Sequence, residues 1–183
     1  YVQELLGKAC GAVSGQANLV KQIVFPVEVL PLKTVLATLF PQLIALCLLA
    51  IYTMISFQTL PWTYVFVPVV IVLQAVLMGG CAFFISAVGV YVRDIREVIQ
   101  TLLLVALYLL PVFYLPDMVP RAFQWLLWLN PFSYMVWCFQ DILYFGSFMH
   151  PVAWIVFPLE SIFAFWAGFK FFRKLKGMFG SQL

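Results

Sequence analysis

The chain has 183 residues, of which 65% are hydrophobic, 18% aromatic and 9% charged, and its mean hydropathy is +1.06. A soluble domain has about 45–50% apolar and about 25% charged residues, so a globule of this composition would leave a large apolar area in water. Ten Lys and Arg against seven Asp and Glu give a net charge of +3, too small and too dispersed for a nucleic-acid-binding surface. The composition predicts an all-α integral membrane protein with the lipid bilayer as its solvent and no nucleic-acid partner.

Residues 1–33 are the most polar part of the chain. Polar side chains at 16, 18, 21 and 22, with apolar neighbours at 19, 20 and 23–25, predict a short amphipathic helix on the cytoplasmic side of the membrane. Pro26 and Pro31 then interrupt the chain before the first long apolar stretch.

Four later stretches are predicted to cross the bilayer, which takes about 20 apolar residues. They are residues 35–57, 65–90, 98–115 and 152–169. The second stretch contains small residues of the kind that lets membrane helices approach closely, namely Gly79, Gly80, Ala82, Ser86, Ala87 and Gly89. The loop at 91–97 is densely charged and must lie outside the hydrocarbon.

The stretch 122–146 is long enough to span but is broken by Asn130-Pro131, and the charge distribution decides how it is interpreted. Because Lys and Arg accumulate on the cytoplasmic side, residues 1–33, the 91–97 loop and the tail 170–183 should share one face. This requires two crossings between residues 97 and 170, so residues 117–146 are predicted to form a re-entrant hairpin on the outer side. Nine of the ten basic residues are then cytoplasmic and only Arg121 is outside, whereas five spans would place the basic tail outside.

The sequence lacks the common catalytic and cofactor motifs, including a GxxxxGK[ST] phosphate loop, GxSxG and HExxH. The four Cys are isolated and His150 is the single His, so no metal site is expected. The chain is therefore predicted to be neither an enzyme nor a cofactor carrier, and any active transport must be powered by another chain or an ion. Glu160 is the one charge deep in a predicted span, and either an internal hydrogen bond or a functional role would explain it.

Aromatic residues concentrate in the predicted hairpin. Two explanations are open: an interfacial belt at headgroup level, or a route on which sugar rings stack while polar side chains meet their hydroxyls. The residues predicted to line such a pathway or gate are Trp125, Trp128, Asn130, Phe132, Tyr134, Trp137, Gln140, Asp141 and Glu160.

Five runs of residues resemble motifs of one family of membrane proteins. The run ANLVKQIVFPVEVLPL at 17–32 is similar to the NANLIKK-x-x-FPxEILPL segment of polysaccharide ABC-exporter permeases, which export O-antigen, capsule and teichoic acid. The YVRDI at 91–95 is similar to their FRDI loop. LPVFY at 110–114, MVP at 118–120 and LNPF at 129–132 follow their SPVxY, MVP and LNP succession, with Leu110 in place of Ser. The resemblance covers residues 1–176 in order.

The resemblance implies a function and a set of partners. Family members have six spans per subunit, so this chain is expected to lack the first two. They work as homodimers with separate ATP-binding cassette ATPase subunits, which carry the ATP and Mg, and they export lipid-linked polysaccharide across the inner (cytoplasmic) membrane as multi-pass proteins. Residues 16–31 would be the coupling element and 117–146 the gate. The residues assigned to ATPase coupling are Asn18, Lys21, Phe25, Pro26, Glu28, Arg93 and Asp94.

Two alternatives remain beside this interpretation. A drug or lipid exporter of the same architecture would have the same spans and coupling element. A non-transporting membrane scaffold would use residues 1–33 as a surface anchor. Co-purification with an ATPase subunit separates the scaffold from both exporters.

Overall fold

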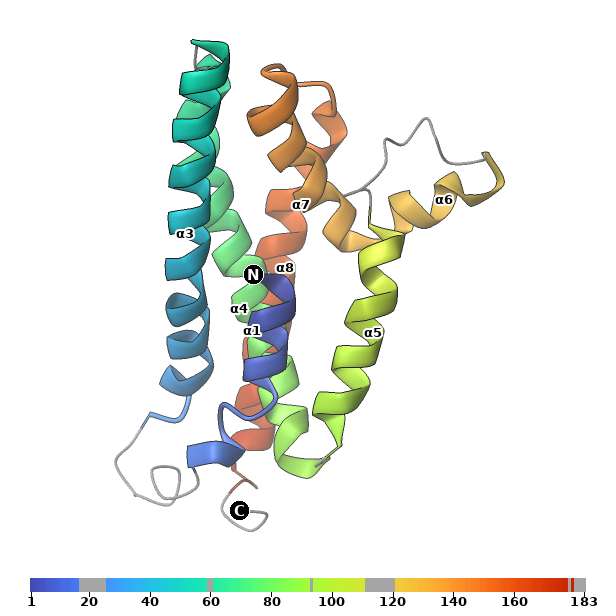
Figure 1. Ribbon diagram of the computed structural model, residues 1–183. Helices are drawn as coiled ribbons and strands as arrows, with labels where there is room; N and C mark the ends of the chain where they lie inside the picture. Colours follow the sequence, from blue (N-terminus) through green and yellow to red (C-terminus); the bar gives the residue numbers. More distant parts are fainter. Residues whose placement is uncertain (17–25, 59–60, 93, 111–120, 178, 180–183) are drawn as a thin grey trace.

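A computed structural model of the chain describes residues 1–183 except 17–25, 59–60, 93, 111–120, 178 and 180–183 (Figure 1). The described part is an elongated bundle of helices, and no strand occurs within it. The predicted all-α class is therefore confirmed for these residues. The elements are α1 (Val2–Ala9), η1 (Ser14–Gln16), α3 (Val29–Phe57), η2 (Trp62–Phe66), α4 (Val67–Tyr91), α5 (Ile95–Leu109), α6 (Arg121–Leu129), α7 (Pro131–Gln140), the π-helical turn η4 (Asp141–Phe145) and α8 (Pro151–Lys176).

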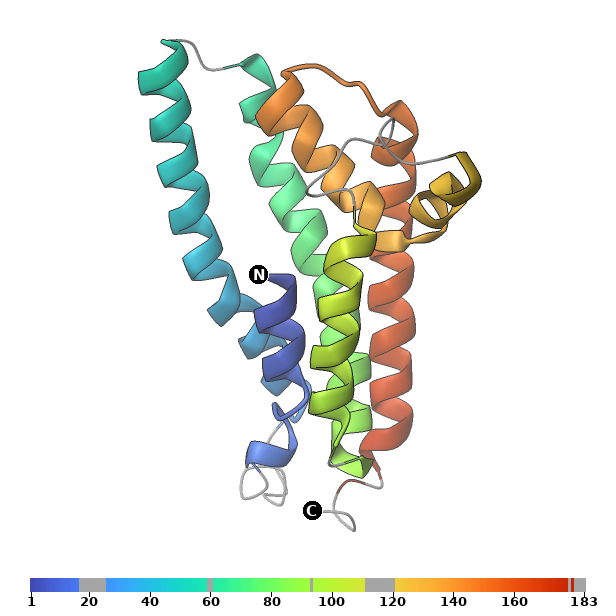
Figure 2. The ribbon, with the colours of Figure 1, turned by 45° about the vertical axis from the view of Figure 1, so that its right-hand side comes forward.

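Helices α4 and α8 form the centre of the bundle and lie side by side along most of their length (Figures 1 and 2). Their backbones approach at Gly80 and Gly168: a Cβ atom on Gly168 would collide with the carbonyl oxygen of Gly80. A Cβ on Gly80 would collide with the backbone of Ala164 and Phe165. The small residues predicted to permit close approach are buried in α4, and Gly80 is the point of contact.

Phenylalanine side chains fill the α4–α8 interface towards the end that carries the C-terminus. The ring of Phe83, which is fully buried, lies 5.7, 5.3 and 5.4 Å from the rings of Phe165, Phe169 and Phe172, all in edge-to-face geometry. Edge-to-face pairs are worth about 0.5–1.5 kcal/mol each beyond the area they bury. This end of the helix pair is therefore closely packed by aromatic rings.

Helix α3 begins at Val29, six residues before the predicted start at 35, because Pro31 does not interrupt it. A proline in the first turn is tolerated, since the backbone N–H it lacks would have no partner there. Most α3 side chains are exposed, among them Leu36, Phe40 and Ile55 at 67–74%. Gln42 Nε2 donates to Gln74 Oε1 of α4 at 2.7 Å, which joins two polar groups inside an otherwise apolar contact.

Helix α1 lies among the long helices and contacts α3, α4 and α5 (Figure 2). Leu5, Leu6 and Ala9 are buried in these contacts, while Glu4 and Lys8 form an exposed ion pair of 2.6 Å on the opposite side. Its N-terminal end lies about halfway along the bundle in Figure 1. The amphipathic helix predicted within residues 16–25 falls mainly outside the described residues, so α1 is a helix that the sequence pattern had not indicated.

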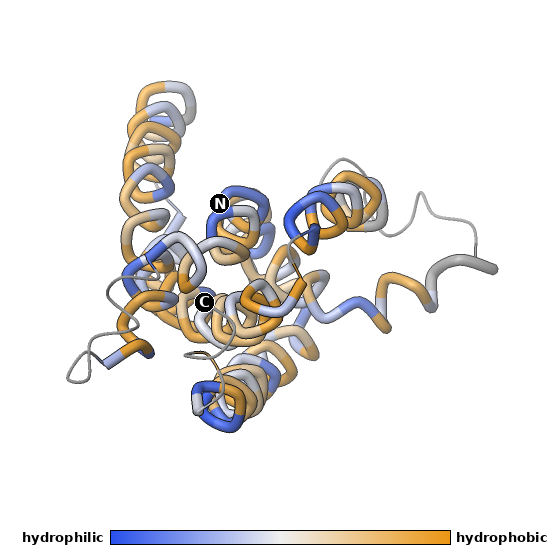
Figure 3. Tube along the Cα trace, turned by 90° about the horizontal axis from the view of Figure 1, so that it is seen from below, coloured by the Kyte–Doolittle hydropathy of each residue, from blue (hydrophilic) through white to orange (hydrophobic). Residues whose placement is uncertain are grey.

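Three of the described helical segments are long and apolar enough to cross a membrane, namely Val29–Ser56, Trp62–Tyr91 and Pro151–Lys176. They correspond to the predicted spans 35–57, 65–90 and 152–169, the last of which extends through the basic residues at its end. For the predicted span 98–115, the described helix is Ile95–Leu109, with 15 residues, and positions 111–115 lie outside the described residues. Seen from below, with α3 and α6 at opposite sides, the tube is mostly hydrophobic along α3 (Figure 3).

Candidate functional site

The broken stretch predicted from the sequence folds as two short helices, α6 and α7, that meet at Asn130-Pro131. Asn130 Oδ1 accepts a hydrogen bond from the backbone N–H of Phe132 at 3.1 Å, and Pro131 occupies the first helical position, so the sequence favours a new helix start here. The Tyr134 hydroxyl donates to the carbonyl oxygen of Trp128 at 2.7 Å across the junction. The angle between α6 and α7 is therefore fixed by both backbone and side-chain contacts.

Three of the predicted pathway aromatics form one cluster at this junction. The ring of Trp128 lies 6.5 Å from that of Tyr134 and 5.0 Å from that of Trp137, and Tyr134 and Trp137 are 5.4 Å apart. Trp125 and Trp128 are 57% and 51% exposed, whereas Trp137 is 1% exposed. The predicted aromatic set thus separates into exposed rings on α6 and, on α7, the buried ring of Trp137 with the half-buried rings of Phe132 and Tyr134.

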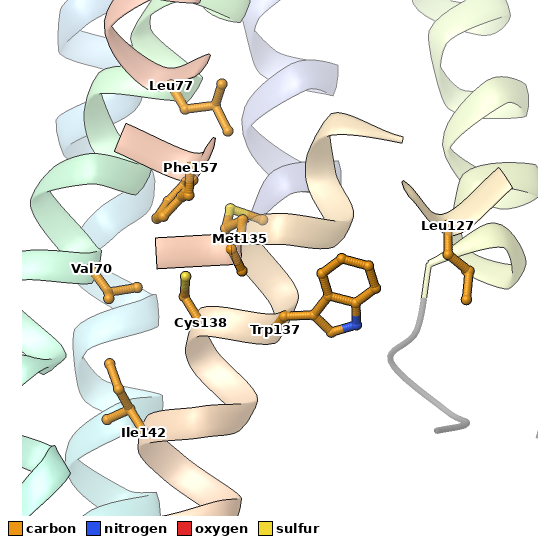
Figure 4. Packing of buried hydrophobic residues seen from close by; sticks show 9 residues of the cluster. Val70, Leu77, Leu127, Met135, Trp137, Cys138, Ile142 and Phe157 are labelled. Atoms are coloured by element: carbon orange, nitrogen blue, oxygen red, sulfur yellow. The ribbon is translucent and has the colours of Figure 1, made fainter. Parts of the chain in front are cut away.

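One side of helix α7 packs against the centre of the bundle. Met135 and Cys138 point towards Phe157 of α8 and Val70 of α4, while Trp137 points away from them (Figure 4). Phe132 also packs at the edge of this cluster and is half-buried. Since Trp137 contacts Trp128 of α6 while Met135 and Cys138 pack towards α4 and α8, helix α7 connects α6 to the centre of the bundle.

Asp141 follows α7 and is completely buried. Its Oδ1 lies 2.7 Å from Nδ1 of His150, and its Oδ2 accepts hydrogen bonds from the His150 backbone N–H and from Trp154 Nε1, both at 3.0 Å. His150 stacks on Trp137 at 5.5 Å with ring planes 5° apart. The carboxylate that was predicted to meet sugar hydroxyls thus joins η4 to the start of α8.

Two other predicted polar residues lie near this region. Gln140 precedes Asp141 and is half-buried. Glu160 lies in the first half of α8, and its Oε1 is buried without a hydrogen-bond partner among the described residues. A carboxylate oxygen in that position is costly inside a membrane, so Glu160 remains a candidate for a role beyond packing.

Three of the predicted coupling residues, Pro26, Glu28 and Asp94, are described, and they lie at the end of the bundle where α3 begins and α8 ends (Figure 1). Glu28 accepts hydrogen bonds from Lys176 Nζ at 2.8 and 2.9 Å. Partial burial raises the pKa of Glu28, but the hydrogen bonds and charge of Lys176, with the nearby charge of Arg173, outweigh it and hold the pKa below its ordinary value. Pro26 and Asp94 are exposed. Asn18, Lys21, Phe25 and Arg93 lie outside the described residues.

Sequence reasoning missed His150 and Trp154, which complete the contacts of Asp141. They are nine and thirteen residues further along the chain, beyond a turn in which Gly146 adopts a φ of 64°. A charged residue inside an apolar run indicates that a partner exists, but no helical spacing identifies which residue it is. His150 had been considered only as a metal ligand, and the described residues contain no group of three or more His, Cys, Asp or Glu that could hold a metal.

A family model described as ABC-2 type transporter matches residues 10–144, most of the chain, including α3 to α7. The chain belongs to the ABC-2 type transporter family. The chain is 24% identical over 168 residues to an O-antigen export system permease protein RfbA of Klebsiella pneumoniae. The matched region covers 91% of the chain and 64% of that protein. It is also 24% identical over 182 residues to an O-antigen export system permease protein RfbA of Myxococcus xanthus, covering 97% of the chain and 69% of that protein. The chain thus spans slightly less than two thirds of the length of the Klebsiella relative.

Proposed function

We propose that the chain is the membrane-spanning permease subunit of an ABC exporter that moves a lipid-linked polysaccharide across the inner membrane. The observation that carries the proposal is the similarity over 91–97% of the chain to relatives named O-antigen export system permeases. Three helices long and apolar enough to span a membrane agree with such a subunit. A separate ATP-binding cassette ATPase, with ATP and Mg, supplies the energy, and the permease acts as a homodimer without enzymatic activity of its own.

In this proposal the cytoplasmic end transmits force and the outer hairpin gates the path. The segment containing Asn18, Lys21 and Phe25 docks on the ATPase, together with Pro26 and Asp94. The Glu28–Lys176 ion pair transmits its movement to α8. At the other end, the exposed rings of Trp125 and Trp128 are available for stacking on sugar rings, and the Asp141 contacts anchor that surface to α8.

The coupling role is tested by comparing two alanine variants in the complete complex. Phe25→Ala is expected to uncouple or dissociate the ATPase more strongly than Lys21→Ala, because an aromatic interface anchor contributes about 2 kcal/mol or more and an exposed ion pair about 0–1. The measurement is glycan exported per ATP hydrolysed, with assembly checked by pull-down. Normal export by Phe25→Ala in an intact complex would refute the coupling assignment.

The four-crossing topology with a re-entrant hairpin at 117–146 belongs to the same proposal and has its own test. In a background without native Cys, a membrane-impermeant thiol reagent applied from outside should label a Cys at Asp117 or Ser147 and spare one at Arg96 or Lys174. Outside labelling at position 174 would contradict the re-entrant arrangement.

An exporter for a drug or another lipid is the alternative, because the family match alone does not select the cargo. A deletion strain that loses surface glycan, and regains it only with this chain and its ATPase, would support polysaccharide export. Retained glycan with altered lipid or drug efflux would support the alternative.

A further inference from the structure

A hollow of about 430 Å³ lies on the outer surface of α8 near its C-terminal end, lined by Trp166, Phe169, Lys170 and Arg173. It combines two aromatic rings with two cations on one side of the helix, since these positions are three to four residues apart. The hairpin contacts described above do not use this surface, although the ring of Phe169 also packs on Phe83 and the charge of Arg173 also acts on Glu28.

Both cations in the hollow are held against aromatic rings. Lys170 Nζ lies 4.7 Å from the centre of the Trp166 ring, and the guanidinium carbon of Arg173 lies 5.7 Å from the centre of the Phe169 ring. Within the described part of the chain, neither forms an ion pair: the basic partner of Glu28 is Lys176. The two charges are therefore positioned in advance, and an external anion can neutralise them.

An exposed apolar strip continues from this hollow along α8. Leu159, Ile162, Phe163 and Trp166 are 58–67% exposed. Leu159 lies eleven residues before Lys170, about 16 Å along a helix that rises about 1.5 Å per residue, which is about half of a hydrocarbon core of about 30 Å. The strip therefore matches the depth of one leaflet, and Trp166 lies near its headgroup edge, where Trp is favoured.

We propose that Lys170 and Arg173 bind the phosphate group of an anionic phospholipid, whose acyl chains lie along the strip from Trp166 to Leu159. The charge of the site selects the headgroup, because a zwitterionic lipid offers no net negative charge to the paired cations. The apolar strip selects an amphiphile over a free phosphate ion. The site is independent of the exported cargo and would tie the basic end of α8 to the inner leaflet.

The test uses the full chain reconstituted in phosphatidylcholine nanodiscs that contain a minor fraction of phosphatidylglycerol. After extraction and a delipidating detergent wash, mass spectrometry gives the ratio of the two lipids that remain bound. Phosphatidylglycerol is expected to be enriched above its fraction in the bilayer. Lys170→Gln and Arg173→Gln should each lower that enrichment about fivefold, whereas Lys174→Gln should change it by less than about twofold.

Lys174 is the matched control because it has the same charge, is exposed on the same helix and does not line the hollow. An equal loss in Lys174→Gln would mean diffuse attraction to a basic tail and would overturn the site. Equal retention of both lipids, or displacement of phosphatidylglycerol by inorganic phosphate alone, would also overturn it. If a second copy of the chain covered the strip, brominated lipids of either headgroup would fail to quench the fluorescence of Trp166. That result would also overturn the proposal. Far-UV circular dichroism checks that each variant is folded.

Discussion

Replacement of Gly168 by Ala tests the backbone contact between α4 and α8. The new Cβ would collide with the carbonyl oxygen of Gly80, and a backbone atom cannot move aside as the end of a flexible side chain can. Overpacking costs about 1–3 kcal/mol, and this rigid obstacle places the cost near the upper end. Ala gains about 1 kcal/mol over Gly in a helix, so the net loss in the free energy of unfolding is about 2 kcal/mol.

Gly177→Ala is the control because a Cβ there meets no atom of the described residues within 4 Å. Its free energy of unfolding should stay within about 0.5 kcal/mol of that of the parent chain. Unfolding is followed by far-UV circular dichroism during titration with sodium dodecyl sulfate in mixed micelles. Since Gly80→Ala disturbs the same contact, the double variant should lose less than the sum of the two single losses. Equal stability of the Gly168→Ala and Gly177→Ala variants would refute the close contact.

Three other expectations concern polar and aromatic contacts. Asp141→Asn should lower the free energy of unfolding by about 2–3 kcal/mol, measured by the same titration, because a buried carboxylate loses charge-assisted hydrogen bonds. Glu28→Gln should cost up to about 1 kcal/mol near neutral pH, since Lys176 is partly exposed. The pKa of Glu28 is lowered in the folded state, so the stabilisation by the ion pair is present above the ordinary pKa of Glu28 and is lost as the pH falls through the lower folded value. A difference in stability between the parent chain and the variant that persists in acid would contradict this assignment. Trp128→Ala and Tyr134→Ala should reduce glycan export with ATPase assembly intact; misfolding of both would assign the rings to packing.

Three of the four spans and the small-residue contact on α4 could be predicted because both depend on local pattern. An uncharged apolar stretch of sufficient length and a run of small residues are visible without a fold. The partner of Gly80 could not be predicted, since nothing in the α4 pattern identifies Gly168 as the facing residue. The predicted start of α3 is too late because Pro31 was expected to interrupt the helix. Pro31 lies in the first turn, where a proline is tolerated.

The candidate site could likewise be predicted only in part. Asn130-Pro131 predicted a chain break, and the structure has a helix start there with an Asn cap. The role of Asp141 depends on the π-helical turn and on Gly146, which together bring His150 and Trp154 back to the carboxylate. Those contacts are set by the path of the backbone after the helix, and residue spacing carries no information about it.

The contact between Gly80 and Gly168 also determines where the molecule can deform. The backbones of α4 and α8 are in close contact at Gly80 and Gly168, and aromatic rings pack the same interface, so we expect the two helices to move as one rigid unit. Helix α3 leaves most of its side chains exposed, and a Gln42–Gln74 hydrogen bond crosses its contact with α4. Relative movement is therefore concentrated between α3 and α4, so a force that the Glu28–Lys176 ion pair passes to α8 would move α4 and α8 together relative to α3.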